Sequence, residues 1–482
     1  MMILSTLLAS SLGSPPPRPL FSAGELNVTM YRIPVLVALP PDNRTLLAFA
    51  EARLPCERSC GQTTNWGDSS PKHIAFRRST DGGQHWTPTK FIVRSNGTND
   101  NLNLGNVVHD ARKGVLLLQW GGCVHCGCSG TVPKPKSCAD PHSARAMQLA
   151  SSDRGQSWGP AADISRQVLS AAWPVLKFGE GSGVQLPATG ELVVCGRVSN
   201  LAAPCAVSDA QGSSNCGSAC IHSSDGGAHW QQGALIGGPV PGVPEERGNE
   251  AEPALLRNGS ILLNMRAGNE RILGRSDDGA RSFVDVHSAP SLTPVANCQG
   301  SMASSADGSG TLFFTAPHGL QRKNLSLAIS HDDGQSWTWD QVITAGPAAY
   351  SSLAPVSALC AALLFEGGST GPDSDSRGPY EHIYFTSVCA ASASGAAATT
   401  TAATTPLKGD DTEGGGVVAT PVTSCDSDQA EGGAALPVVP AVQLRQLGRS
   451  ATAHTSYPTG NKDFSVLESF PAQGQRCLAR LA

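Results

Sequence analysis

The chain has 482 residues, of which 53 are glycine and 34 are proline, and charged residues make up only 15%. Because glycine and proline mark turns and interrupt helices, this balance favours a turn-rich β protein over a helical bundle. The net charge of −5 argues against a general nucleic-acid binder, which normally carries a basic face. The absence of any run of about 18 apolar residues argues against a transmembrane helix.

The N-terminal segment Met1–Ser14 is apolar and rich in small residues, but no Lys or Arg precedes its apolar run. We interpret residues 1–20 as a candidate signal peptide. Sequons for N-glycosylation begin at Asn27, Asn43, Asn96, Asn258 and Asn324. Together these features predict a glycoprotein of the secretory pathway, with a lysosomal or extracellular location.

Fifteen cysteines are many for a cytosolic protein, and several lie close together in the sequence. The groups are Cys56 and Cys60; Cys123, Cys126, Cys128 and Cys138; and Cys205, Cys216 and Cys220. A zinc site at Cys123 and Cys126 is the alternative, but it lacks a second pair at matching distance. We favour disulfides in the loops, and the odd count leaves at least one thiol unpaired or joined to another chain.

An internal repeat dominates the middle of the chain. The pattern Ser-x-Asp-x-Gly-x-x-Trp begins at Ser79, Ser151, Ser223 and Ser330, and a degenerate copy begins at Ser276. In that copy, Ala280 and Phe283 occupy the last two positions of the pattern. The starts are 53 to 72 residues apart, and each copy follows a short apolar segment that predicts a strand.

The chemistry of the repeat suits a hairpin turn. Its Asp can accept backbone N–H bonds across the turn, and its Gly supplies a positive φ. We expect its Trp to pack over the strands of its own unit. One tight turn in each blade-sized repeat predicts an all-β propeller, whose radial closure protects the strand edges.

This motif is the Asp box, and through it the sequence resembles the exo-α-sialidases, in particular those of the eukaryotic lysosomal type. The resemblance covers about residues 24–390 and implies a six-bladed β-propeller with Asp-box hairpins over residues 21–390. The boxes are structural, and they also occur in propellers that only bind glycans. A prediction of activity therefore depends on other residues.

The resemblance implies three arginines that hold the carboxylate of a sialic acid. Guanidinium suits this task because it is permanently charged and binds a carboxylate through two parallel hydrogen bonds. The matching positions are Arg32 in an Arg-Ile-Pro motif, Arg266, and Arg322 upstream of the last box. Lys323 is adjacent to Arg322 but would point the other way on a strand.

The nucleophile of the family is a neutral tyrosine, which the substrate carboxylate does not repel as it would a carboxylate nucleophile. Tyr350, in a Tyr-Ser-Ser-Leu segment after the last box, matches it. A phenol needs an adjacent base at neutral pH. The resemblance implies Glu250, which lies 16 residues before Arg266, and Glu252 is the alternative.

The acid that protonates the leaving oxygen is implied at Asp68, which lies 11 residues before Ser79. The segment 55–66 before it is an apparent insertion with two cysteines, which we interpret as a disulfide-closed loop over the site. Arg53 resembles an arginine near the acid, and Glu366 resembles a glutamate that pairs with the first arginine.

The implied reaction needs no cofactor and no metal, and the expected partner is a sialylated glycan. Two rivals remain: a trans-sialidase with the same residues, and a non-catalytic glycan-binding propeller, against which Tyr350 and Glu250 weigh. Residues 380–385 predict the closing strand. Residues 391–482 include low-complexity Ala-, Thr- and Gly-rich stretches, and we interpret them as a C-terminal tail that is disordered.

Overall fold

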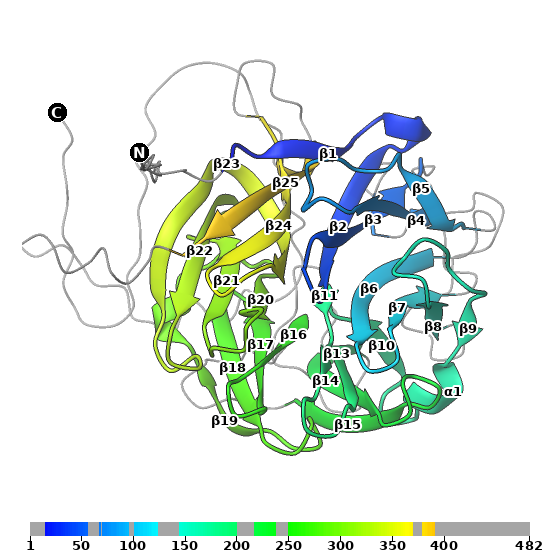
Figure 1. Cartoon of the computed structure of the whole chain (residues 1–482), viewed down its shortest axis with the longest axis vertical. Helices are drawn as coiled ribbons and strands as arrows, with labels where there is room; N and C mark the ends of the chain where they lie inside the picture. Colours follow the sequence, from blue (N-terminus) through cyan, green and yellow to red (C-terminus); the bar gives the residue numbers. More distant parts are fainter. Residues whose placement is uncertain are drawn as a thin grey trace, which may run out of the picture. The chain divides into compact units, whose positions relative to one another are not determined.

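Short strands and tight turns alternate along nearly the whole described part of the chain, which makes the protein all-β (Figure 1). The fold is that of a computed structural model whose described residues are 15–55, 67–68, 70–95, 101–123, 144–199, 216–237, 249–369 and 378–390. They belong to one compact unit, Met1–Thr401. The predicted C-terminal tail and most of the candidate signal peptide lie outside these residues.

Helical structure is scarce within the described residues. They contain one α-helix, α1 (Ser165–Val168), and the 3₁₀ turns η1 (Glu25–Asn27), η3 (Pro290–Leu292) and η4 (Gly378–Tyr380). None of these helices is long and apolar enough to cross a membrane.

Four of the sheets contain four or five strands, and almost all of their strand pairs are antiparallel. The first is β2 (Met30–Leu39), β3 (Thr45–Arg53), β4 (Lys72–Ser79) and β5 (Lys90–Val93). The second is β11 (Gly181–Ser182), β6 (Asn101–Asp110), β7 (Val115–Cys123), β8 (Ala144–Ser151) and β9 (Ala162–Asp163). The third is β10 (Val175–Phe178), β13 (Leu192–Ser199), β14 (Cys216–Ser223) and β15 (Gln231–Ile236), with β12 (Val184–Gln185) beside β13. The fourth is β16 (Ala251–Leu255), β17 (Ile261–Ala267), β18 (Glu270–Ser276) and β19 (Val284–Ser288).

The remaining sheet has seven strands and divides within its longest one. Its order is β1 (Arg18–Ser22), β25 (His382–Cys389), β24 (Cys360–Gly367), β23 (Thr338–Pro355), β22 (Lys323–Ser330), β21 (Leu312–Pro317) and β20 (Ser301–Ser304). Residues of β23 up to Pro347 pair with β22, and residues from Ala348 onward pair with β24. The sheets form a ring, with β2, β11, β16 and β20 toward its centre and β5, β9, β15 and β19 at its periphery (Figure 1).

The two ends of the described chain meet in one sheet. β1 pairs antiparallel with β25, with Ser22 opposite His382. The strand predicted at residues 380–385 therefore begins later, at His382, and Tyr380 ends the 3₁₀ turn η4 instead. The outermost strand of this sheet is β1, which the sequence pattern did not predict.

All five predicted Asp boxes form the same hydrogen-bonded turn. In the first, Ser79 Oγ donates to Asp81 Oδ1 at 2.7 Å, and the N–H groups of Gly83 and His85 donate to Ser79 Oγ and Asp81 Oδ1. The other four boxes, at Asp153, Asp225, Asp278 and Asp332, repeat these three bonds. The degenerate copy is thus a complete box, with Ala280 at a φ of 65°.

Two box tryptophans, Trp86 and Trp158, differ from the prediction because they contact a neighbouring sheet, whereas Trp337 packs against Phe314 of its own sheet. Trp158 follows β8 but packs edge-on against Phe49 and Phe76 of the first sheet, with centroids 5.7 and 6.0 Å apart. Trp86 follows β4 but packs against Phe385 of β25 at 5.2 Å. The rings of Trp86 and Trp158 each fill the space between two sheets, so these two boxes join units as well as turning the chain.

Within the described residues, two disulfides form, and both join neighbouring strands. Cys195 of β13 bonds Cys220 of β14, and Cys360 of β24 bonds Cys389 of β25. Both pairs are directly opposite in the strand register, with Cα atoms 3.9 and 4.0 Å apart. Cys298 is a buried free thiol. The loop cysteines Cys56, Cys60, Cys126, Cys128, Cys138 and Cys205 lie outside the described residues, so the loop disulfides and the alternative zinc site stay predictions.

Candidate active site

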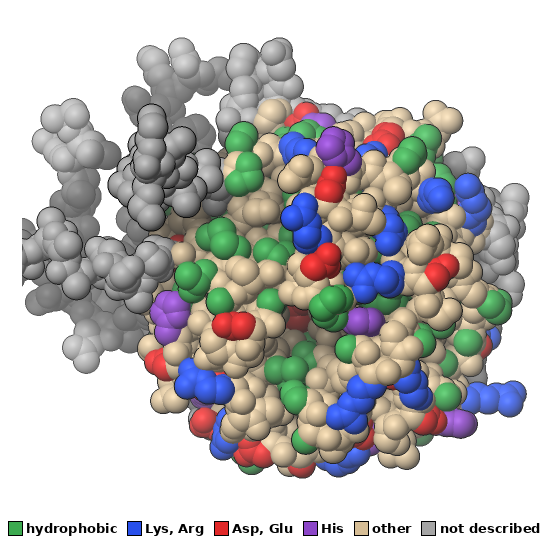
Figure 2. Space-filling view, in the orientation of Figure 1, with side chains coloured by type: hydrophobic (Ala, Val, Ile, Leu, Met, Phe, Trp, Pro, Cys, Tyr) green, Lys and Arg blue, Asp and Glu red, His purple; other side chains and the backbone are tan. Residues whose placement is uncertain are grey.

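Charged side chains from several sheets converge on a cavity of about 430 Å³, a volume within the usual range for small-molecule sites. Seven of the eight predicted site residues line it: Arg32, Arg53, Asp68, Glu250, Arg266, Arg322 and Tyr350. The eighth, Glu366, lies behind this lining and contacts Arg32. The face of the molecule in Figure 2 is hollowed near its middle, with acidic and basic side chains around the hollow.

The Arg-Ile-Pro motif places Arg32 through a bulge in β2. The register with β3 shifts between Arg32 and Val35, and Ile33 has a φ of 56°. A bulge of this kind turns a side chain away from the regular pleat. Because Pro34 has no N–H to donate, the strand cannot continue its hydrogen-bond ladder at that residue. The proline of the Arg-Ile-Pro motif therefore helps to interrupt the regular strand pairing beside Arg32.

Glu366 on β24 holds Arg32 in place. Its two carboxylate oxygens accept from Arg32 Nε at 2.9 Å and from Arg32 Nη2 at 3.0 Å. The same carboxylate accepts the backbone N–H of Ile33 at 2.8 Å and that of Tyr350 at 3.2 Å. Glu366 is fully buried, so this two-pronged pair forms out of water and fixes the direction of the guanidinium.

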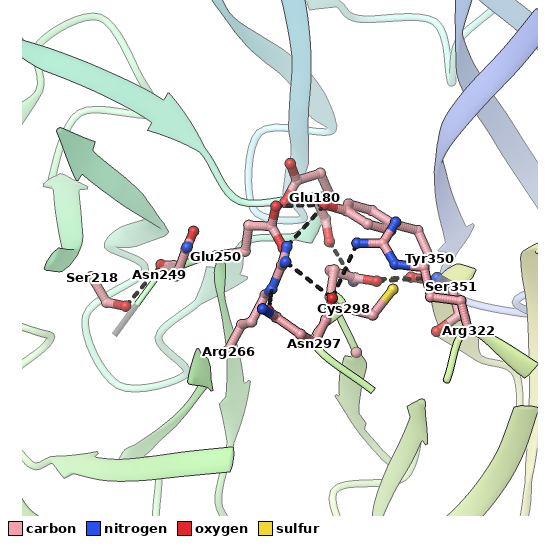
Figure 3. Close-up of polar contacts among 12 residues, drawn as sticks. Glu180, Ser218, Asn249, Glu250, Arg266, Asn297, Cys298, Arg322, Tyr350 and Ser351 are labelled. Atoms are coloured by element: carbon pink, nitrogen blue, oxygen red, sulfur yellow. Dashed lines mark hydrogen bonds and ion pairs between the residues drawn. The ribbon is translucent and has the colours of Figure 1, made fainter. Parts of the chain in front are cut away.

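Tyr350, Glu250 and Arg266 form one connected group (Figure 3). Tyr350 Oη donates to Glu250 Oε1 at 2.6 Å, and Arg266 Nη1 donates to Glu250 Oε2 at 2.8 Å. Arg266 Nη1 also donates to Tyr350 Oη at 3.2 Å. A phenol on a carboxylate that an arginine also binds is the arrangement expected of a nucleophile with its base.

The charges in this group set its protonation. Burial, and then the charge of Glu250, raise the pKa of Tyr350 well above its ordinary value. Burial opposes ionisation of Glu250 as well, but the Arg266 guanidinium holds its pKa below the ordinary value. The resting group is therefore a neutral phenol beside an ionised carboxylate. Tyr350 can act as a nucleophile only if Glu250 takes its proton.

Glu252, the alternative base, has a different position. Its side chain is buried, and its two oxygens accept the backbone N–H groups of Ser182 and Met302, each at 2.9 Å. It thereby connects β16 to β11 and to β20. Among the described residues, Glu250 and not Glu252 contacts the tyrosine hydroxyl.

Asn297, which the sequence did not single out, joins the second and third arginines. Its backbone oxygen accepts from Arg266 Nη2 and from Arg322 Nη2, each at 3.1 Å, and its Oδ1 accepts from Arg266 Nε at 2.8 Å. Arg322 Nη1 also donates to Tyr380 Oη at 2.7 Å. Lys323, beside Arg322, is exposed, as its predicted direction requires.

Asp68, the predicted acid, also lines the cavity and forms an ion pair with Arg53. Arg53 Nη2 is 2.9 Å from Asp68 Oδ1, and Nη2 also donates to the buried Glu51 at 2.9 Å. The Asp68 side chain is 74% exposed, and the Arg53 charge holds its pKa well below the usual range. Residues 56–66 of the predicted insertion lie outside the described residues.

The third sheet and the segment that follows its strand β10 supply three cavity residues that no motif predicted: Lys177, Glu180 and Arg197. Lys177 and Arg197 lie directly opposite each other on β10 and β13. The only sequence signal was the glycine-rich run 179–183 after the second box, which indicates close backbone packing. Among the described residues, no group of three or more His, Cys, Asp or Glu side chains is placed to hold a metal ion.

A family model described as "BNR repeat-like domain" matches residues 71–358. The sialidase of Micromonospora viridifaciens is 26% identical over 382 residues, which cover 74% of this chain and 54% of that protein. Sialidase-4 of Homo sapiens is 29% identical over 285 residues, which cover 56% of this chain and 54% of that protein. The chain therefore spans about half the length of these relatives.

Solved sialidase structures share the fold. The Hadza microbial sialidase Hz136 aligns with a TM-score of 0.59 at 20% identity, covering 77% of this chain and 68% of that one. Trypanosoma rangeli sialidase, in complex with 2,3-difluorosialic acid as a covalent intermediate, aligns with a TM-score of 0.57 at 19% identity. The alignment covers 78% of this chain and 58% of that one. The chain thus belongs to the BNR repeat-like domain family, and its relatives in sequence and in fold are sialidases.

Proposed function

We propose that the chain is an exo-α-sialidase that releases terminal α-linked sialic acids from glycoproteins, glycolipids or oligosaccharides. The observation that carries this proposal is the contact of Tyr350 with Glu250 at 2.6 Å, inside a cavity that three arginines also line. A phenol activated by a carboxylate, beside guanidinium groups, fits a sugar whose anomeric carbon bears a carboxylate.

The three arginines Arg32, Arg266 and Arg322 would bind the substrate carboxylate. Their guanidinium groups are all held by partners within the site, namely Glu366, Asn297, Glu250 and Tyr380. A charged group that is already oriented loses little side-chain entropy when the substrate binds. This preorganisation supports an anion-binding role.

The proposed reaction proceeds in two balanced steps. In the first, Tyr350 Oη attacks the anomeric carbon and forms a bond to it, and its proton passes to Glu250 Oε1. The bond to the leaving oxygen breaks, and that oxygen takes a proton from Asp68. In the second, Asp68 removes a proton from a water molecule, which attacks the anomeric carbon; Tyr350 leaves and recovers its proton from Glu250. Two displacements at one carbon retain its configuration.

Asp68 can serve this cycle because Arg53 binds it at the cavity wall. In the free protein the Arg53 charge keeps Asp68 ionised. A substrate that carries a negative charge and displaces water from the cavity raises the pKa of a nearby carboxyl. We propose that Asp68 acquires its proton in the complex and not before.

The proposal extends to architecture and location. Counting the seven-stranded sheet as two units that share β23, the described strands support a six-bladed β-propeller. Two strand-to-strand disulfides favour an oxidising compartment, in line with the lysosomal or extracellular location that the sequons predict.

The test is Tyr350→Phe, assayed by release of the fluorophore from fluorogenic α-sialosides of acetylated and deaminated sialic acid. Turnover should fall at least about 10³-fold, because the nucleophile is lost, while the free energy of unfolding changes by about 1 kcal/mol. Tyr31→Phe is the matched control, since Tyr31 is also buried but its hydroxyl bonds the backbone oxygen of Glu25. The control should retain activity.

Two further measurements separate the alternatives. Incubation with 2,3-difluorosialic acid, followed by peptide mass analysis, should place a covalent adduct on Tyr350. Hydrolysis gives free sialic acid, whereas intramolecular transfer, as in the leech trans-sialidase with its 2,7-anhydro product, gives a sugar lighter by one water. Wild-type inactivity on both sialosides would contradict the enzyme proposal, and an active Tyr350→Phe variant would contradict the nucleophile.

A further inference from the structure

Glu180 occupies a position in the cavity that the reaction above does not use. It lies between β10 and β11, in the segment Gly179-Glu180-Gly181. A Cβ at Gly179 would come within 2.0 Å of the Ala251 backbone oxygen, and one at Gly181 within 2.0 Å of Glu252 Oε1. The two glycines thus let this segment press against β16, next to Glu250.

The backbone of Glu180 is also fixed from the other side. Gln299 Nε2 donates to the Glu180 backbone oxygen at 3.1 Å and to the Ser351 backbone oxygen at 3.0 Å. Ser351 is the neighbour of the nucleophile in β23. One amide group therefore ties the position of Glu180 to that of Tyr350.

One oxygen of the Glu180 carboxyl, Oε2, is enclosed without a hydrogen-bond partner among the described residues, although the residue as a whole is only partly buried. Figure 3 shows the side chain next to Glu250 and Tyr350. An ionised carboxylate with an oxygen buried away from water and donors is unfavourable, and a proton on the carboxyl removes this cost.

The charged and titratable groups that line the cavity with Glu180 come from several elements. They are Glu250 before β16, Arg266 on β17, Tyr350 on β23, Glu51 and Arg53 on β3, Lys177 on β10 and Arg197 on β13, with Arg32, Asp68 and Arg322 elsewhere in the lining. Burial, and then the charge of Glu250, raise the pKa of Glu180 well above its ordinary value. The neighbouring cations do not reverse this direction.

We propose that Glu180 is a positioning residue that must stay protonated for the Tyr350–Glu250 pair to work, and that its ionisation switches the site off. This inference rests on the proposed function. With Glu180 neutral, Glu250 holds the single negative charge of the carboxyl pair and can accept the tyrosine proton. The proton on Glu180 remains there throughout the reaction.

Ionised Glu180 would oppose the reaction in two ways. A second negative charge beside Tyr350 disfavours negative charge on the attacking phenol oxygen, because ionised Glu180 would raise the pKa of the tyrosine further. It also repels the substrate carboxylate in a cavity where water screens little. Activity should therefore fall as pH rises through the titration of Glu180, while protonation of Glu250 sets the acid limb.

The experiment compares pH profiles of kcat/KM for the wild type and Glu180→Gln, with the fluorogenic sialoside as probe. Glutamine has the same shape and cannot ionise. The variant should keep the acid limb and lose the alkaline one. When kcat/KM is expressed relative to each protein's own maximum, the value for the variant should exceed that of the wild type by about tenfold for each pH unit above the wild-type alkaline midpoint.

The control is Glu191→Gln, a buried carboxyl immediately before β13 whose oxygens bond Arg281 and His222 and which does not line the cavity. It should leave both limbs in place. If Glu180→Gln is poorly folded by thermal melting, Glu180→Ala provides the same loss of charge with less bulk, and the same profile is expected.

Two outcomes would overturn the inference. An unmoved alkaline limb would assign it to another group, such as the buried Lys72, whose pKa is lowered to about 8 by burial. An equal loss of activity at every pH would indicate a purely structural role for Glu180. Both differ from an inactive wild type, which would contradict the proposed function itself.

Discussion

The buried ion pair between Arg32 and Glu366 fixes the orientation of several groups at the site. The side chains are 9% and 0% exposed, and the carboxylate also accepts two backbone N–H groups, so its four bonds orient both Arg32 and the strand that carries Tyr350. An ion pair this enclosed is hardly screened by salt, and removal of one partner leaves an uncompensated buried charge.

Glu366→Gln should therefore lower the free energy of unfolding by about 3 kcal/mol and raise KM more than it lowers kcat. Urea denaturation and steady-state kinetics would measure the two effects. Glu25→Gln is the control, because the Glu25–Arg77 pair is partly exposed and should change stability by less than about 1 kcal/mol. Similar losses for both variants would contradict the importance of burial here.

At this scale the sequence predicted the residues that belong to a motif and missed those that do not. Arg32, Arg266 and Tyr350 have characteristic neighbours in the chain. Asn297 acts mainly through its backbone oxygen, which any residue type could supply, and Glu180 depends on two glycines against a strand that follows much later. No local pattern carries that information.

The Asp box is the element that gives the fold its regularity. In four boxes a glycine has a φ between 77° and 86°, a region that other residues rarely adopt. The box glycine also approaches the next sheet: a Cβ on Gly334 would lie 2.5 Å from Leu262 Cδ2. Its absence of a side chain therefore serves both the turn and the packing between sheets.

Gly334→Ala should lower the free energy of unfolding by about 2–4 kcal/mol, from backbone strain and overpacking together. Gly308→Ala is the matched control, since its φ is +68° but no atom lies within 4 Å of the added Cβ. That variant should lose only about 1 kcal/mol. Equal melting temperatures for the two variants would show that contact with Leu262 is unimportant.

The degenerate box explains why a repeat can diverge and still fold. Ala280 keeps all three hydrogen bonds of the turn at a φ of 65°, and its methyl group is fully buried. The strain of about 1 kcal/mol is offset by about 0.8 kcal/mol from the buried methyl. The sequence predicted these turns correctly, but it could not predict which sheet each Trp contacts.

Across the whole molecule, the box carboxylates act together on acid stability. Hydrogen bonds from Ser157 lower the pKa of Asp153 to about 2, and hydrogen bonds from the His229 backbone lower that of Asp225 to about 2. Because these folded-state values lie below the ordinary 3.8, the boxes contribute fully above that pH. Their contribution is lost as pH falls toward 2.

The melting temperature should therefore be nearly constant from neutral pH down to about pH 4.5 and then drop steeply toward pH 2. Thermal melts across this range would measure it. In Asp225→Asn the melting temperature at neutral pH should be lower than in the wild type, and its decrease toward pH 2 should be smaller, because one titrating carboxylate has been removed. A wild-type melting temperature that rises below pH 4 would contradict this account.

At the scale of the whole chain, the closure through β1 and β25 has a consequence for biosynthesis. Ser22 Oγ and His382 Nδ1 lie 3.0 Å apart although 360 residues separate them in the chain. A ribosome that adds about 5–20 residues per second needs roughly 20–70 seconds to make that interval. For this time β1 has no strand to pair with, so its backbone N–H and C=O groups stay available for pairing with other chains.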